Sequence, residues 1–124
     1  MKPKIAVVED NIDNRLLVQA ILEDQYEISE YESGMEVMDG LADDIPDLVL
    51  LDISLPGMDG TEVLHWVRSQ EQLSNLPVIA LTAHAMSGDR ERYLEMGFDE
   101  YVTKPIVDEE VLMGAIERLL ARSA

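Results

Sequence analysis

Apolar runs alternate with helical patterns along this chain, and the runs have the length of strands. The candidate strands span residues 4–8, 26–31, 48–52, 78–81 and 100–103. The runs 4–8, 48–52 and 78–81 consist almost entirely of Val, Ile, Leu and Ala. This composition is typical of central strands in a parallel sheet, because helices cover both faces of such a sheet. The run 26–31 mixes apolar and acidic residues, which favours an edge strand.

The segments after the first two runs carry helix signals. A first helix is expected to begin near Asn11 and Asp13, because both residue types cap helix N-termini. The residues predicted to share its apolar face are Leu17, Ala20 and Ile21. A second helix is expected over residues 34–42.

Three more helices are expected farther along the chain. One follows Gly60, and its residues at helical spacing are Thr61, Leu64 and Val67. The next is expected to begin near Ser87 and to end at Gly97, since glycine is favoured just after a helix C-terminus. The last has an amphipathic stripe that consists of Val111, Leu112, Ala115, Ile116, Leu119 and Leu120.

Strands that alternate with helices predict a doubly wound α/β fold with right-handed crossovers and helices on both faces of the sheet. No linker, low-complexity stretch or internal repeat interrupts residues 1–124. We therefore expect a single domain over the whole chain.

Composition excludes several classes of function. The chain has 124 residues, and 9 basic against 26 acidic residues give a formal charge of −17. This charge repels nucleic acid, so no nucleic-acid partner is expected. There are no cysteines, which excludes disulfides and thiolate metal sites. No apolar run reaches the roughly 20 residues that cross a bilayer, and no secretory signal is present. A cytoplasmic protein without membrane contact is expected.

Polar residues follow the predicted strands, and in open parallel sheets ligands bind beyond the carboxyl ends of the strands. The residues at these ends are Glu9, Asp10, Asp52, Thr82, Thr103 and Lys104. Carboxylates about 4 Å apart repel by roughly 4 kcal/mol at an effective dielectric near 20. A bound cation is therefore expected to stabilise the acidic cluster. Mg²⁺ suits one or two carboxylates together with phosphate oxygens. A carboxylate can also act as a nucleophile and form an aspartyl phosphate.

Four segments together resemble the receiver domain of bacterial two-component response regulators, the CheY-like superfamily. The matching segments are 7–11 (VVEDN), 52–60 (DISLPGMDG), 81–83 (LTA) and 101–105 (YVTKP). The second segment alone is highly specific, and the resemblance extends over essentially the whole chain. It implies a flavodoxin-like sheet with the strand order 2-1-3-4-5. It also implies a phosphorelay switch rather than an enzyme, with at most intrinsic autophosphatase activity.

The resemblance implies roles for individual residues. Asp52 is the expected phosphoacceptor, and its phosphoryl donor is a sensor histidine kinase or a histidine phosphotransfer protein. Thr82 and Lys104 are expected to contact the phosphoryl group, and Tyr101 is expected to turn inward when Thr82 moves. The expected Mg²⁺ ligands are Glu9, Asp10, Asp52 and the backbone carbonyl of Ser54.

The resemblance also implies finer features. Ser54 and His84 occupy positions where the family tunes the lifetime of the phosphate. The peptide bond before Pro105 is expected to be cis. A downstream protein is expected to bind the face formed by the fourth helix, the fifth strand and the fifth helix. The methionines considered as a border of that face are Met86, Met96 and Met113.

Two functions from other classes fit less well. A phosphatase of the haloacid dehalogenase type also uses a strand-end Asp and Mg²⁺, but it needs a second Asp where this chain has Ser54. A flavin carrier would cradle a phosphate in its first loop, and Glu9 and Asp10 would repel that phosphate.

Within the signalling class, two forms stay open. Met1 and the short sequence after the last helix favour a stand-alone regulator that resembles the DivK type. The segment 83–91 also resembles receivers of hybrid histidine kinases, so the alternative is a receiver excised from such a kinase.

Overall fold

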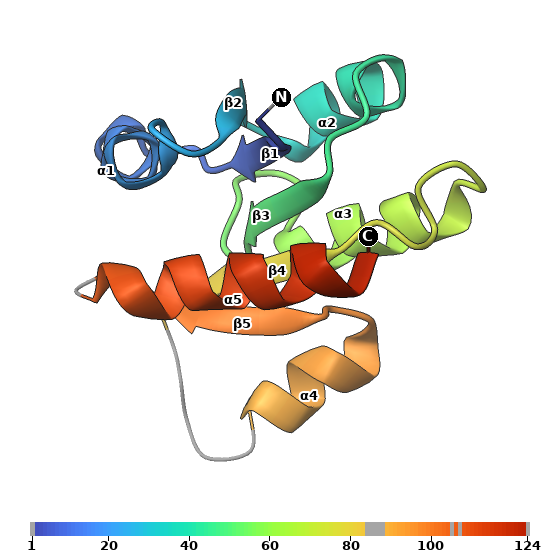
Figure 1. The fold of residues 1–124 in the computed structure, drawn as a ribbon. Coiled ribbons are helices and arrows are strands. Elements are labelled where there is room, and N and C mark those ends of the chain that lie inside the picture. Colours follow the sequence, from blue (N-terminus) through green and yellow to red (C-terminus); the bar gives the residue numbers. More distant parts are fainter. Residues whose placement is uncertain (1, 84–88, 105, 107, 124) are drawn as a thin grey trace.

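A parallel sheet forms the centre of the molecule (Figure 1). The computed structural model describes residues 2–83, 89–104, 106 and 108–123. The strands are β1 (Lys4–Val8), β2 (Glu27–Tyr31), β3 (Leu48–Asp52), β4 (Val78–Thr82) and β5 (Glu100–Thr103). They form a 5-stranded sheet in the order β2-β1-β3-β4-β5, and every neighbouring pair is parallel. The expected flavodoxin-like order is therefore confirmed, and β2 lies at an edge as predicted.

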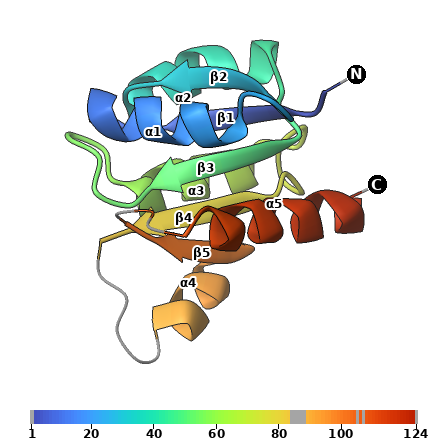
Figure 2. The same cartoon turned by 60° about the vertical axis from the view of Figure 1, so that its left-hand side comes forward.

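Helices cover both faces of this sheet (Figures 1 and 2). They are α1 (Ile12–Leu22), α2 (Gly34–Gly40), α3 (Gly60–Ser69), α4 (Asp89–Met96) and α5 (Glu109–Ser123). A short 3-10 turn, η1 (Leu41–Asp43), completes the segment that the sequence predicted as one longer second helix. Ser87, where the fourth helix was expected to begin, lies outside the described residues. None of the helices in the described part of the chain has both the length and the apolar character needed to cross a bilayer.

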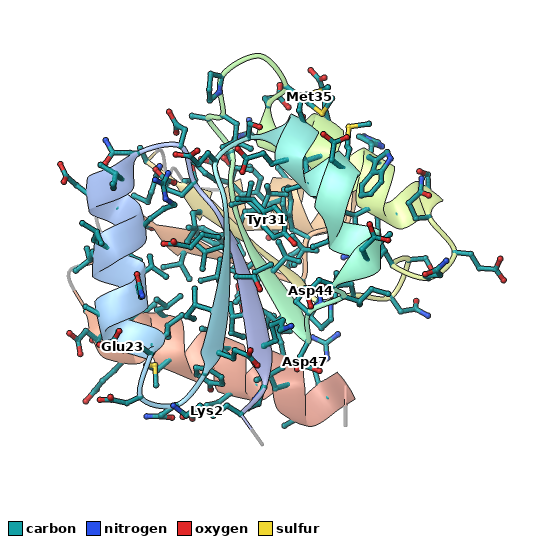
Figure 3. All side chains as sticks on the ribbon, turned by 90° about the horizontal axis from the view of Figure 1, so that it is seen from above. Lys2, Glu23, Tyr31, Met35, Asp44 and Asp47 are labelled. Carbon is teal, nitrogen blue, oxygen red and sulfur yellow. The ribbon has the colours of Figure 1, made fainter. Side chains whose placement is uncertain are left out.

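Alternate side chains of the strands build two apolar cores, one on each face of the sheet. Ala6 and Leu51 point into the core beneath α2 and α3, which also contains Tyr93 of α4. Ile5 and Leu50 point into the opposite core beneath α1 and α5. Figure 3 shows side chains packed into the space between the sheet and the helices on either side of it. Because both faces are covered, the central strands β1, β3 and β4 are buried over almost their whole length.

The predicted helix boundaries have clear structural causes. The side chain of Asn11 accepts hydrogen bonds from the backbone N–H groups of Asp13 and Asn14 at 2.9 and 3.1 Å, which caps α1. Asp59 caps α3 in the same way, and hydrogen bonds from Thr61 and Glu62 lower the pKa of Asp59. These capping groups satisfy backbone donors that would otherwise lack a partner at the start of each helix.

Gly97 ends α4 as predicted, because its φ of 115° is a conformation that side-chain-bearing residues avoid. Gly57, in the loop between β3 and α3, also has a positive φ, of 78°. Both glycines therefore provide backbone conformations at places where the chain reverses.

The predicted apolar face of α1 is wrong for two of its three residues, whereas Ile21 packs partly against the core beneath α1 and α5. Leu17 and Ala20 are exposed, and the buried residues of the helix are Arg15, Val18 and Leu22. Helical periodicity assigns arginine to the surface, so the predicted apolar face is turned about the helix axis relative to the face that is buried. In the structure Arg15 is buried because its guanidinium donates to backbone carbonyls at the end of β1. Val111 of α5 is also 54% exposed rather than part of the buried stripe.

The chain enters and leaves the fold at the same end of the sheet. In Figure 2 the start of β1 and the end of α5 lie on one side, and the arrowheads of the strands point to the other. The carboxyl ends of the strands therefore form an edge that lies away from both of these points.

Candidate functional site

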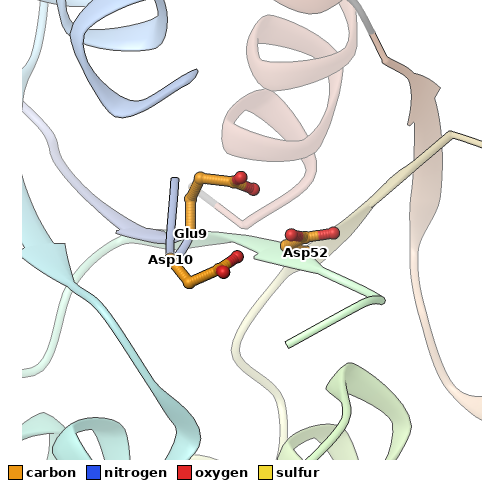
Figure 4. A group of neighbouring side chains, drawn as sticks. All are labelled: Glu9, Asp10 and Asp52. Carbon is orange, nitrogen blue, oxygen red and sulfur yellow. The ribbon is translucent and has the colours of Figure 1, made fainter. Parts of the chain in front are cut away.

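Three acidic side chains gather at the carboxyl edge of the sheet. Glu9 and Asp10 directly follow β1, and Asp52 is the last residue of β3. One carboxylate oxygen from each lies within 4.8 Å of the others. Figure 4 shows Glu9 and Asp10 extending from the end of β1 toward Asp52. Glu9 and Asp52 are buried, whereas Asp10 is exposed, so the cluster opens to solvent on one side.

Lys104 is the cation of this cluster. Its Nζ lies 3.0 Å from Oδ1 of Asp52 and 3.4 Å from Oε2 of Glu9. The backbone N–H of Lys104 donates to the carbonyl of Thr82 at 2.7 Å, which fixes the chain just beyond β5. Burial alone would lower the pKa of Lys104, but the contacts with Asp52 and Glu9 outweigh it and raise the pKa. The ammonium therefore stays protonated and partly balances the carboxylates.

At Glu9 the positive charge of Lys104 does not fully offset burial and the charge of the neighbouring carboxylate. Burial raises the pKa of Glu9, and the neighbouring Asp52 carboxylate raises it further. The side-chain amide of Asn14 donates to Oε1 of Glu9 at 2.9 Å, and this bond and Lys104 only partly offset the rise in pKa. A second, divalent cation would remove the remaining repulsion. The donor set of clustered carboxylates with an open side fits Mg²⁺, which prefers oxygen ligands and keeps several waters.

Arg15 fixes the loop that carries Glu9 and Asp10. Its Nη1 donates to the backbone carbonyls of Glu9 at 2.8 Å and of Asp10 at 3.1 Å. Its Nη2 pairs with Oε1 of Glu32 at 3.1 Å. Neither Arg15 nor Asn14, which contacts Glu9, was predicted from the sequence. The available signal was their position, because both lie in the first turn of the helix that follows the acidic pair.

The backbone around Asp52 is also closely constrained. The N–H of Ser54 donates to Oδ1 of Asp52 at 3.0 Å. A Cβ on Gly60 would lie 2.4 Å from the backbone oxygen of Asp52, which is closer than atoms can approach. The N–H of Gly60 donates to the carbonyl of Ile53 at 2.9 Å. Gly60 therefore allows α3 to start directly against the chain that leaves Asp52, a steric role that the sequence did not indicate.

Thr82 and Tyr101 lie on the β4–β5 side of the site. Thr82 is the last residue of β4 and is buried, and it lies one position beyond Leu81, the cross-strand neighbour of Asp52. Its Oγ1 is 3.2 Å from the hydroxyl of Tyr93, a residue that the sequence analysis did not single out. Tyr101 is half-buried, and its ring centroid is 6.0 Å from that of Tyr93.

Several predicted residues lie near the site in sequence or on the proposed partner face. His84, Met86 and Pro105, with the predicted cis peptide bond, lie outside the described residues. Met96 is 38% exposed at the end of α4, and Met113 packs partly against the core beneath α5. Only Met96 of these two therefore offers a substantial apolar surface to a partner.

Comparison with known proteins identifies the family. The model of the response regulator receiver domain matches residues 5–117. The DivK polar-differentiation response regulator of Brucella ovis is 42% identical over 107 residues, which cover 86% of this chain and 87% of DivK. The sensor protein GacS of Pseudomonas syringae pv. syringae is 40% identical over 113 residues, which cover 88% of this chain but only 12% of GacS.

A solved structure agrees with these relatives. The receiver domain of the sensor histidine kinase PA1611 from Pseudomonas aeruginosa PAO1 superposes with a TM-score of 0.87 at 31% identity. The match covers 98% of this chain and 99% of that one. That structure has a magnesium ion coordinated in the active site cleft. The fold, the acidic edge of the sheet and these similarities together show that the chain belongs to the response regulator receiver domain family of two-component signalling.

Proposed function

We propose that Asp52 is the phosphoacceptor of this receiver domain. The observation that carries the proposal is the 3.0 Å contact between Nζ of Lys104 and Oδ1 of Asp52 inside the acidic cluster. The donor is a phosphohistidine of a sensor histidine kinase or of a phosphotransfer protein. An Asp52 carboxylate oxygen attacks phosphorus, and the new P–O bond forms as the P–N bond breaks. The electron pair of that bond stays on the imidazole, which takes up a proton.

The proposed Mg²⁺ ligands are the carboxylates of Glu9, Asp10 and Asp52 together with the backbone carbonyl of Ser54. The geometry supports this assignment, because one carboxylate oxygen from each of Glu9, Asp10 and Asp52 lies within 4.8 Å of the others. The ion found in the related PA1611 receiver supports it as well. Bound Mg²⁺ would neutralise charge between Asp52 and the incoming phosphoryl oxygens.

Phosphorylation adds a charge of about −1.5 to −2 at the end of β3. Lys104 then pairs with the phosphoryl group, and the Thr82 hydroxyl donates a hydrogen bond to it. Tyr101 turns into the space that Thr82 leaves. Moving a two-state equilibrium from 1:99 to 99:1 takes about 5.5 kcal/mol of differential interaction. New charge-assisted bonds from two side chains, at about 1.5–3 kcal/mol each, supply most of it.

A downstream protein would detect this change by binding the face formed by α4, β5 and α5. Glu100 at the start of β5 pairs with Arg90 of α4 at 3.1 Å and lies 3.8 Å from Arg118 of α5. These ion pairs link the three elements, so a movement of β5 reaches both helices. A downstream protein that binds this face would therefore sense the state of Tyr101.

Intrinsic hydrolysis resets the switch, since water attacks the aspartyl phosphate and releases inorganic phosphate. Ser54 and His84 flank the site in sequence and are proposed to set the lifetime of the phosphate. We further propose that residues 1–124 act as one receiver unit in the cytoplasm. The unit works either alone, as in the DivK type, or within a longer kinase chain.

Incubation with acetyl phosphate, with and without Mg²⁺, tests the assignment by intact-mass measurement. The wild-type protein should gain the mass of one phosphoryl group only when Mg²⁺ is present, and Asp52→Asn should gain none. Asp47→Asn is a matched control, because Asp47 lies just before the opposite end of β3. Persistent labelling of Asp52→Asn would refute the proposal.

A further inference from the structure

Tyr93 places a hydroxyl group deep beside β4. It lies on α4 and is only 4% exposed. Its ring packs edge-on against Phe98, with centroids 5.9 Å apart at 89°, and lies tilted against Tyr101 at 6.0 Å. A buried tyrosine hydroxyl needs a hydrogen-bond partner, because leaving it unpaired costs free energy.

The hydroxyl of Tyr93 is 3.2 Å from Oγ1 of Thr82, which is itself only 2% exposed. Nη2 of Arg92 lies farther from the same hydroxyl, at 3.5 Å, and its guanidinium stands over the Tyr93 ring at 5.2 Å from the centroid. Arg92 is also engaged with Asp89 at 3.2 Å. The contact with Thr82 is therefore the shorter and more buried of the two.

This contact competes with the step assigned to Thr82. Either hydroxyl of this pair can be the donor. Where Thr82 donates to Tyr93, its single hydrogen must leave Tyr93 before it can reach a phosphoryl group on Asp52 at the end of β3. We propose that Tyr93 is a positioning residue that holds Thr82 in its resting orientation, and that phosphorylation exchanges the Thr82–Tyr93 hydrogen bond for one to the phosphoryl group. This inference rests on the proposed function of Asp52 and Thr82.

The exchange has a consequence for α4. When Thr82 turns away, the Tyr93 hydroxyl loses the shorter of its two contacts with the described residues. Arg92, already at 3.5 Å, is the neighbouring donor on the same helix. Phosphorylation would therefore change α4 directly through Tyr93, in addition to any movement of Tyr101 on β5.

Tyr93→Phe tests the proposal, because it removes the hydroxyl and retains the ring that packs on Phe98 and Tyr101. Beryllofluoride with Mg²⁺ serves as the phosphoryl analogue, and calorimetry measures its affinity. A net hydrogen bond is worth about 0.5–1.5 kcal/mol, so Tyr93→Phe should bind the analogue about two- to tenfold more tightly than wild type. Tyr26→Phe is the matched control, since Tyr26 is buried in the core on the opposite face of the sheet.

A double-mutant comparison separates positioning from a general structural effect. In a Thr82→Ala background, Tyr93→Phe should no longer change the affinity for beryllofluoride, because its effect acts through Thr82. Hydrogen exchange of residues 89–96 should also respond less to the analogue in Tyr93→Phe than in wild type.

The outcomes distinguish failure of the role of Tyr93 from failure of the role of Asp52. Equal or weaker binding by Tyr93→Phe, with wild type binding normally, overturns the role of Tyr93 and leaves the role of Asp52 intact. A gain in affinity that persists in the Thr82→Ala background also overturns it. Failure of the wild-type protein to bind beryllofluoride in the presence of Mg²⁺ removes the proposed function and this inference together.

Discussion

Arg15 holds the backbone carbonyl of Glu9 at 2.8 Å, so a buried cation fixes the residue that carries a buried anion. The same guanidinium reaches Asp10 and is itself paired with Glu32. The orientation of both acidic side chains of the β1–α1 loop therefore depends on a residue that does not belong to the acidic cluster.

Arg15→Gln should weaken Mg²⁺ binding, because Gln cannot hold the Glu9 and Asp10 carbonyls together. Residues that orient metal ligands typically contribute about 10- to 100-fold to metal affinity. Calorimetric titration of the variant with Mg²⁺ measures the change, and Arg118→Gln, on the surface of α5, should leave the affinity unaltered. An Arg15→Gln protein that is folded and binds Mg²⁺ like wild type would contradict the prediction.

Lys104→Gln should separate metal binding from phosphoryl transfer. It removes the positive charge 3.0 Å from Asp52, so the carboxylates should bind Mg²⁺ at least as tightly as before. Phosphorylation by acetyl phosphate should slow by about 10²–10³-fold, the usual effect of removing one electrostatic stabiliser of a transition state. Rapid sampling with intact-mass detection gives the rate. Lys4→Gln, which removes a surface partner of Asp44, is the control.

Glu9→Gln should stabilise the metal-free protein and diminish its response to Mg²⁺. The pKa of Glu9 is raised above the ordinary value of 4.5, so the folded state holds this proton more tightly than the unfolded chain. Raising the pH from 4.5 through the pKa of the folded state therefore removes stability through Glu9. Thermal unfolding of the variant without metal should give a higher Tm than wild type near neutral pH, with a smaller pH dependence in that window.

The response of Glu9→Gln to Mg²⁺ provides the second readout. Mg²⁺ should raise the Tm of wild type more than that of the variant, because the variant has lost a charged ligand. A metal-free variant less stable than wild type would show that the contacts of Glu9 with Lys104 and Asn14 outweigh its burial and its repulsion from Asp52.

Gly60→Ala should destabilise the fold. Its Cβ would lie 2.4 Å from the backbone oxygen of Asp52 and 2.8 Å from Cα of Ile53, so the backbone must shift. Overpacking of this kind costs about 1–3 kcal/mol in the free energy of unfolding, measurable by urea titration. Gly114→Ala in α5 is the control, because its nearest neighbour is the Nη1 of Arg118 at 3.3 Å. It should be neutral or stabilise by up to about 1 kcal/mol.

Local sequence patterns predicted the sheet well, because continuous apolar runs such as 48–52 have few alternatives to a buried strand. The polar residue at the end of each strand is also visible in the sequence, and the parallel topology then predicts that Glu9, Asp52 and Lys104 lie at one edge of the sheet. Capping residues such as Asn11 contact backbone groups only two or three positions away, so their role can be predicted from the local sequence.

The residues that escaped prediction act across the fold. Arg15 is buried only because carbonyls at the end of β1 and acids beyond β2 meet its guanidinium, and helical periodicity contains no such information. Tyr93 follows Thr82 by eleven positions, and their contact exists only once α4 packs beside β5 at the edge of the sheet. The steric requirement at Gly60 depends on its distance to the backbone of Asp52, which only the packing of α3 against β3 creates.

The start of β1 and the end of α5 both lie away from the acidic edge of the sheet (Figure 2). A neighbouring domain, linker or affinity tag attached at either point would leave the approach to Asp52 free. The reactive end of the sheet would therefore stay accessible whether the receiver acts alone or within a longer chain.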